Sequence, residues 1–204
     1  MAALPLRKVI NAGFPGTAAV PFLLVFLMMA FPAAVMAGPI YLPLLMKDPG
    51  QSVVSLQNGD FEKGPDGSWK EFSSKGYPLI MTIKDLGLYP QGGSWAAWLG
   101  GVDGETSILS QVITVPSKAT TLNFYYLILS NEGQGTCGAD RAYVKFDAKD
   151  LKPPYELCSN MTDWALEQID ISGYRGKTVE LVFKVVNNNF RPSDFYLDTV
   201  SISQ

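Results

Sequence analysis

The chain has 204 residues, with 16 basic and 19 acidic side chains and no histidine. The lack of histidine excludes a Ser-His-Asp or Cys-His catalytic centre and the common types of zinc site. Without the first 37 residues, which hold two basic and no acidic side chains, the net charge is 14 − 19 = −5. A domain with this net negative charge lacks the positive charge that attracts nucleic acid or an anionic membrane surface.

The N-terminal residues 1–37 predict a secretory signal peptide. Arg7 and Lys8 form a basic start, residues 19–46 carry no charge, and small residues at 33–37 provide a cleavage site after position 37. An uncleaved membrane anchor is the alternative, because about 18 apolar residues can span a bilayer. In both cases the remainder is secreted or displayed at the cell surface. The proline-rich residues 38–52 are expected to be a linker.

Beyond the linker, residues 53–204 are expected to form one all-β domain. Val179, Leu181 and Phe183 alternate with Glu180 and Lys184, which is typical of a half-buried strand. Glycine and proline turns separate many such segments, and this spacing indicates an antiparallel β-sandwich, or jelly roll. The expected strands are residues 53–57, 79–83, 96–99, 108–115, 121–129, 142–147, 164–171, 178–186 and 195–202.

The chain has two cysteines, Cys137 and Cys158. An even number of cysteines in an exported chain predicts a disulfide. Closing a loop of this size stabilises a fold by about 3 kcal/mol in the chain-entropy account. A reactive thiol pair is the alternative, but such pairs favour close C-x-x-C spacing and a cationic neighbour.

Several motifs occur in a characteristic order. Asn58-Gly-Asp-Phe-Glu62 comes first, Gly-Ser-Trp-Ala-Ala-Trp-Leu-Gly-Gly follows at 93–101, and Phe-Tyr-Leu-Asp-Thr-Val-Ser-Ile closes the chain at 195–202. In this order the chain resembles the galactose-binding-like jelly rolls that include bacterial carbohydrate-binding modules. It is also similar to MAM-type adhesion domains and to accessory jelly rolls of secreted bacterial proteins. The resemblance covers residues 53–204 and implies the fold more strongly than the ligand.

This resemblance implies a structural calcium ion that ties the first segment of the domain to the last strand. Glu62 and Asp198 would be the charged ligands, and Asn58 or Asp60 would complete an oxygen shell of the kind that calcium prefers. The alternative is that residues 58–59 form an ordinary turn and that Asp198 caps a strand end.

Aromatic side chains are the candidates for ligand binding, because the apolar faces of sugar rings stack on them. Tyr125 and Tyr143 fall on the polar faces of their strands and predict an exposed platform. The alternative is a cross-strand tyrosine pair that stabilises the sheet by about 0.2–1 kcal/mol. Trp98 and Trp164 alternate with strand residues and are expected in the core. Four aromatic residues in or beside turns are further candidates: Trp69, Trp95, Tyr89 and Phe190.

These features favour a secreted, non-catalytic binding module that recognises a glycan or another cell-surface polymer. One alternative is a structural or adhesive protein that contacts other proteins, and another is an accessory domain of a secreted hydrolase. A hydrolase would need two close carboxylates, one of them with a raised pKa. The candidate pairs lie in polar turn contexts where both members are expected to be solvated: Asp60/Glu62, Asp103/Glu105 and Asp163/Glu167.

Overall fold

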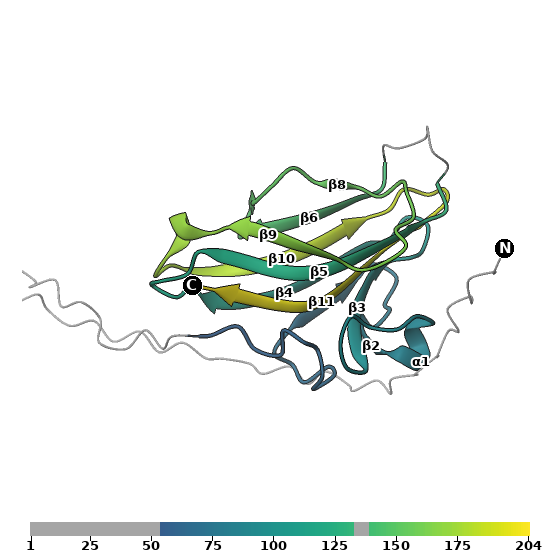
Figure 1. The fold of residues 1–204 in the computed structure, drawn as a ribbon. Helices are drawn as coiled ribbons and strands as arrows, with labels where there is room; N and C mark the ends of the chain where they lie inside the picture. The colour runs from purple at the N-terminus through teal and green to yellow at the C-terminus, as the bar shows by residue number, and fades with distance from the viewer. Residues whose placement is uncertain (1–53, 133–138) are drawn as a thin grey trace, which may run out of the picture. The chain divides into compact units, whose positions relative to one another are not determined.

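The computed structural model describes residues 54–132 and 139–204, which form two stacked antiparallel β-sheets (Figure 1). Sheet A has the order β1 (Lys70–Ser73), β4 (Thr106–Thr114), β10 (Thr178–Val186), β6 (Arg141–Phe146) and β7 (Lys149–Asp150), with β8 (Tyr155–Glu156) also paired to β6. Sheet B has the order β2 (Ile80–Thr82), β3 (Trp95–Gly100), β11 (Ser193–Ser203), β5 (Thr121–Ser130) and β9 (Ala165–Asp170). The expected jelly-roll β-sandwich is confirmed.

The main core lies between the two sheets and follows directly from the alternation in the sequence. In β5, Leu122 and Phe124 are buried, and in β10 Leu181 and Phe183 are buried. Phe124 and Phe183 meet edge to face, with ring centroids 5.2 Å apart. Each strand therefore contributes every second side chain to one shared apolar layer.

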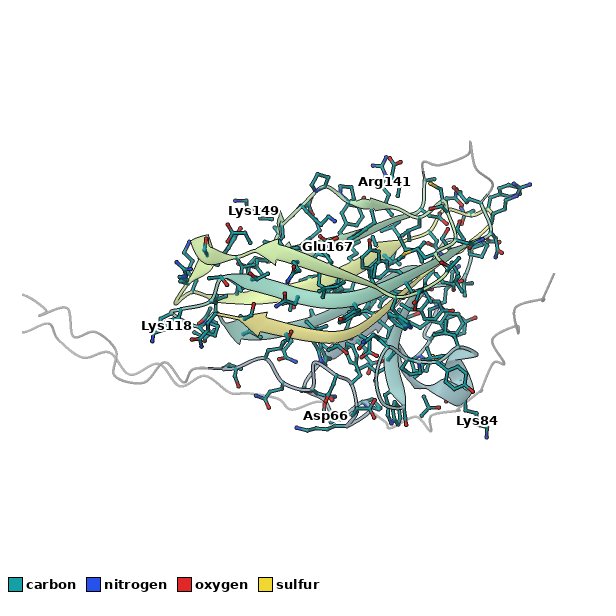
Figure 2. The ribbon with its side chains drawn as sticks, in the orientation of Figure 1. Asp66, Lys84, Lys118, Arg141, Lys149 and Glu167 are labelled. Atoms are coloured by element: carbon teal, nitrogen blue, oxygen red, sulfur yellow. The ribbon has the colours of Figure 1, made fainter. Side chains whose placement is uncertain are left out.

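A second, smaller cluster covers the outer face of sheet B. The helix α1 (Ile83–Leu86) and the segment that follows it pack Leu86 and Leu88 against this face. Trp98 of β3 stacks on Tyr196 of β11, with centroids 5.7 Å apart and an interplanar angle of 19°. Sheet B is thus apolar on both sides, whereas the exposed Lys84 of α1 points away from the sandwich (Figure 2).

The strand predictions need corrections at residues 54–57 and at β1, and the two-residue strands β7 and β8 were not predicted either. Residues 54–57 form no strand, although the Thr114 N–H donates to the Val54 carbonyl and the Gln57 N–H donates to the Gln111 side chain. This segment runs beside β4 without forming a ladder. The strand β1 at Lys70–Ser73 was missed because its sequence, Lys-Glu-Phe-Ser, has a single large apolar residue and no clear alternation.

The predicted signal peptide and linker, residues 1–52, lie outside the described residues. Within the residues that are described, no helix is long and apolar enough to cross a membrane.

Candidate functional site

A cleft of about 560 Å³ opens on the outer face of sheet B. Its floor is formed by Tyr125 and Leu127 of β5. Residues 88–91, between α1 and β3, form one wall, and residues 162–164, just before β9, form the other. The volume falls in the range of small-molecule sites, about 300–1,000 Å³. The cleft therefore lies between two loops, above part of β5.

Three aromatic side chains gather at this cleft. Tyr89 is 82% exposed on one wall, and Trp164 is half-buried on the other. The Trp164 indole N–H donates to the Tyr89 carbonyl at 3.1 Å and joins the two walls. Trp164 also packs against the second cluster, so its position is held from below. Tyr125 on the floor completes a set that presents aromatic surface from three elements.

Polar side chains surround these rings. Gln91, Thr162 and Asp163 line the cleft itself. Asn123 lies two residues before Tyr125 on the same side of β5, and the Gln168 amide donates to its side-chain oxygen at 2.9 Å. Amide groups beside aromatic rings can hydrogen-bond ring hydroxyls while the rings contact apolar faces.

The predicted platform of Tyr125 and Tyr143 is wrong. Tyr125 belongs to β5 in sheet B, whereas Tyr143 belongs to β6 in sheet A, and both point away from the core. They therefore lie on opposite faces of the sandwich. The Lys145 ammonium lies 5.0 Å from the centre of the Tyr143 ring. Neither the platform nor the alternative cross-strand pair exists, because the two strands are not neighbours.

The turn aromatics divide into two groups. Trp69 was expected to be exposed and is 3% exposed, because its ring packs between Phe61 and Phe183 and its indole N–H donates to the Asn58 carbonyl at 2.9 Å. Trp95 is half-buried against the main core. These two side chains stabilise the fold, and the expected exposure of Trp69 is wrong.

Tyr89 and Phe190 are exposed as expected, but they do not share a site. Tyr89 lines the cleft, whereas Phe190 lies in the loop between β10 and β11 and carries the Arg191 guanidinium 4.9 Å from its ring centre. Trp98 is buried as expected. Trp164 is not a core residue: it lines the cleft, and a tryptophan directly after two polar turn residues, Thr162 and Asp163, was the signal that could have indicated this.

The predicted calcium ligands lie around the loop that enters β3. Glu62 accepts hydrogen bonds from the backbone N–H groups of Ser94 and Trp95, both at 2.8 Å. Asp198 of β11 accepts from the Gly92 N–H at 3.1 Å. The two carboxylates therefore hold one loop from two sides. The Val200 N–H also donates to the Gly59 carbonyl at 2.7 Å and joins the first segment to the last strand directly.

The other two predicted ligands differ in their surroundings. The buried Asn58 side chain donates to the Gly64 carbonyl and accepts from the Lys63 N–H, whereas Asp60 is exposed. Burial raises the pKa of Asp198 to about 6, against the lowering effect of its N–H donors. Among residues 54–132 and 139–204 no three His, Cys, Asp or Glu side chains gather as a metal site. Glu62 and Asp198 have the oxygen chemistry that fits calcium, and the ion remains a prediction.

The carboxylate pairs considered for catalysis have structural partners. Glu105 is fully buried and accepts from the hydroxyls of Ser73 and Ser107. Glu167 forms an ion pair with Lys152 and accepts from the Tyr155 hydroxyl, both at 2.6 Å. Figure 2 labels Glu167 on β9, and Glu167 is not among the residues that line the cleft. Asp163 is the carboxylate of these pairs that lines the cleft.

The predicted disulfide involves Cys137, which lies outside the described residues. Cys158 is buried two residues after the end of β8. The pairing of the two cysteines therefore stays a prediction.

Comparison with solved structures places this fold among known domains. A family 61 carbohydrate-binding module solved with β-1,4-galactotriose has a TM-score of 0.57 and 13% identity, covering 75% of this chain and 99% of the module. A family 28 module specific for non-crystalline cellulose has a TM-score of 0.49 and 12% identity, covering 74% and 94%. The K1 cleaved adhesin domain of Lys-gingipain from Porphyromonas gingivalis has a TM-score of 0.49 and 15% identity, covering 71% and 95%.

The likeness to the family 61 module shows that this chain has the jelly-roll β-sandwich fold of a carbohydrate-binding module. No protein-family model and no curated protein matches the sequence.

Proposed function

We propose that this domain binds a neutral glycan, without chemical conversion, in the cleft on the outer face of sheet B. The observation that carries this proposal is the meeting of Tyr89, Tyr125 and Trp164 at one cleft. An 82% exposed tyrosine beside a half-buried tryptophan offers aromatic surface on which a ligand ring can stack.

The chemistry of a sugar ring fits this arrangement. Its apolar C–H face stacks on Tyr125 or Tyr89, and its hydroxyls are within the reach of side chains such as Gln91 and Asp163. The described residues that line the cleft include one acid and no base. An anionic sugar would meet the negative charge of Asp163, so a neutral glycan is favoured. The related fold solved with β-1,4-galactotriose makes neutral β-linked chains the first ligands to test.

The absence of a suitable acid and base pair in this cleft supports binding alone. Glycoside hydrolysis uses two carboxylates about 5–9.5 Å apart, and the described cleft residues provide Asp163 as their single carboxylate. We infer further that the chain is exported through residues 1–37 and meets its ligand outside the cell, as a secreted or cell-surface protein.

A protein-binding, adhesive role is the second candidate, and the outer face of sheet A favours it. Phe72 and Val112 are each about half exposed there, at 50% and 53%. Exposed apolar side chains on a sheet face are a common feature of protein contacts.

A glycan panel tests the proposal most broadly. The purified chain and its Tyr89→Ala variant are applied to arrays of neutral and acidic polysaccharides, with Phe72→Ala as the matched control on sheet A. We expect retention of one or more neutral polysaccharides, lost in Tyr89→Ala and kept in Phe72→Ala. Absence of all retention, or an equal loss in both variants, would remove the cleft as the binding site.

A further inference from the structure

The loops at one end of the sandwich contain buried polar atoms without partners. This end lies where β5 stops, β6 begins and β10 connects to β11. In the described part of the chain, four buried side-chain atoms lack a hydrogen-bond partner. Three of the four are oxygens, and all three are at this end: Glu132 Oε2, Asp140 Oδ2 and Asn187 Oδ1.

Hydrogen bonds place both carboxylates beside the same residue, Asn188. The Asn188 backbone N–H donates to Asp140 Oδ1 at 2.7 Å, and its side-chain amide donates to Glu132 Oε1 at 3.3 Å. One oxygen of each carboxylate is therefore held by Asn188. The second oxygen of each carboxylate is the one without a partner.

The third oxygen belongs to Asn187, the residue before this common neighbour. Its amide nitrogen donates to the Ser193 carbonyl at 2.8 Å and to the Val102 carbonyl at 3.3 Å. These two bonds fix the orientation of the amide and leave Oδ1 on its other side. The Ser193 hydroxyl donates to the Leu157 carbonyl at 2.7 Å, and the Leu157 N–H donates to the Asp140 carbonyl at 3.0 Å, so Asn187 and Asp140 are linked through Ser193 and Leu157.

Such oxygens are costly to bury without a partner. Asp140 is 1% exposed and Asn187 is 4% exposed, so bulk water reaches neither. Burial raises the pKa of Asp140 despite the hydrogen bond from the Asn188 N–H. The same end also holds Glu105, whose carboxylate accepts from three serine hydroxyls. The fold thus satisfies one buried carboxylate fully and leaves two oxygens nearby unsatisfied.

Positively charged protein groups do not provide the missing partner. The ion pairs in the described residues are Lys145–Asp150 and Lys152–Glu167. Arg141 follows Asp140, but the alternation of β6 turns its side chain to the outer side of sheet A, and Figure 2 shows it at the edge of the molecule. Neither Glu132 nor Asp140 is neutralised by these groups.

We propose that Glu132, Asp140 and Asn187 bind a calcium ion at this end of the sandwich, in a site separate from Glu62 and Asp198. Two carboxylate oxygens and one amide oxygen are ligands that calcium prefers, and backbone carbonyls and water complete its six to eight positions. The ligands come from two loops, Glu132 and Asp140 from the β5–β6 loop and Asn187 from the β10–β11 loop, and calcium tolerates such irregular geometry better than magnesium does. A bound ion would join the ends of β5, β6 and β10.

Calcium titration by isothermal calorimetry tests this site. The background is an Asp198→Asn chain, in which the other predicted site has lost a charged ligand. Glu132→Gln and Asp140→Asn are then added separately, each removing one charge with little change in shape. Asp147→Asn is the matched control: it lies in the turn after β6 at the far end of the strand, and asparagine tolerates its positive φ of 52°.

We expect calcium binding in the Asp198→Asn background, weakened at least tenfold by Glu132→Gln and by Asp140→Asn and unchanged by Asp147→Asn. Magnesium at the same concentration should bind at least tenfold more weakly. Circular dichroism confirms folding, and Glu132→Gln decides the result if Asp140→Asn does not fold. Absence of calcium binding in the background, or equal binding in Glu132→Gln, would overturn the proposal and leave ordered water as the partner of these oxygens.

Discussion

The two outer faces of the sandwich are built from the same alternating strands but differ in what lies above them. On sheet B, α1 and residues 87–92 cover a buried Trp98–Tyr196 stack, and the uncovered part becomes an aromatic cleft. On sheet A, Tyr143 and Phe72 stand at the surface beside lysines. Both faces carry aromatic rings, so the position of the loops, rather than the composition of the strands, distinguishes a candidate binding face from an ordinary one.

The largest expected difference between the faces is in stability. Tyr196→Ala removes a ring that is 1% exposed and stacked on Trp98. A loss of about 3–5 kcal/mol in the free energy of unfolding is expected for a large aromatic side chain at such a site. Tyr143→Ala, on the opposite face, should cost less than about 1 kcal/mol. Urea denaturation measures both, and equal losses would show that the cover over sheet B is not a second core.

Calcium should act on the face of sheet B, because Asp198 and Glu62 hold the loop that continues into the wall of the cleft. At a hundredfold excess over its dissociation constant, calcium should raise the free energy of unfolding by about 2.7 kcal/mol. The measurement is made in the Glu132→Gln background. This substitution removes a ligand of the other proposed calcium site, formed by Glu132, Asp140 and Asn187, so that only the site at Glu62 and Asp198 contributes. Thermal melts with and without chelator should differ there, and Asp198→Asn should remove most of the difference. Identical melts would leave Glu62 and Asp198 as acceptors for the loop alone.

The buried Asp198 also predicts a dependence on pH in the presence of chelator. Burial raises its pKa from 3.8 to about 6 in the folded protein. The folded state therefore binds the proton more tightly than the unfolded state, and stability is lost as the pH rises from about 4 to 6. Relative to Asp198→Asn, the wild type should lose about 1–3 kcal/mol over this range. A pH-independent difference between the two chains would contradict the raised pKa.

The smallest of these effects concerns affinity. Tyr125→Ala removes one ring from the floor of the cleft and should weaken glycan binding by about 1 kcal/mol or more, since aromatic rings dominate such contacts. The half-buried ring contributes less to folding, so the melting temperature should change little. Calorimetry and thermal melting are the two measurements. A large drop in melting temperature with unchanged affinity would assign Tyr125 to the sheet instead.

Strand periodicity was readable from the sequence, but the pairing of strands was not. The segment 178–186 was predicted with the bounds that β10 has. Alternation also placed Tyr125 and Tyr143 correctly on the outer sides of their strands. It contains no information on which sheet each strand joins, and that depends on contacts between residues distant in the chain. The tyrosines were therefore assigned to one platform although they lie on opposite faces.

Turn aromatics were equally ambiguous. Tyr89 and Trp69 both follow glycine-containing turns, yet one is exposed and the other is buried. Trp69 can be buried because its indole N–H donates a hydrogen bond to the Asn58 carbonyl, which lowers the free-energy cost of burying this polar group. That partner lies eleven residues away in a loop whose path the sequence does not reveal.

The most direct test of the account is an NMR titration of the isotope-labelled chain with a retained neutral oligosaccharide. Amide shifts should concentrate at residues 88–92, 123–127 and 162–168, on the outer face of sheet B. Residues 141–146 and 182–184, which carry Tyr143 and its neighbours on sheet A, should remain unchanged. Shifts confined to sheet A, with the cleft residues unaffected, would contradict the assignment of the binding site.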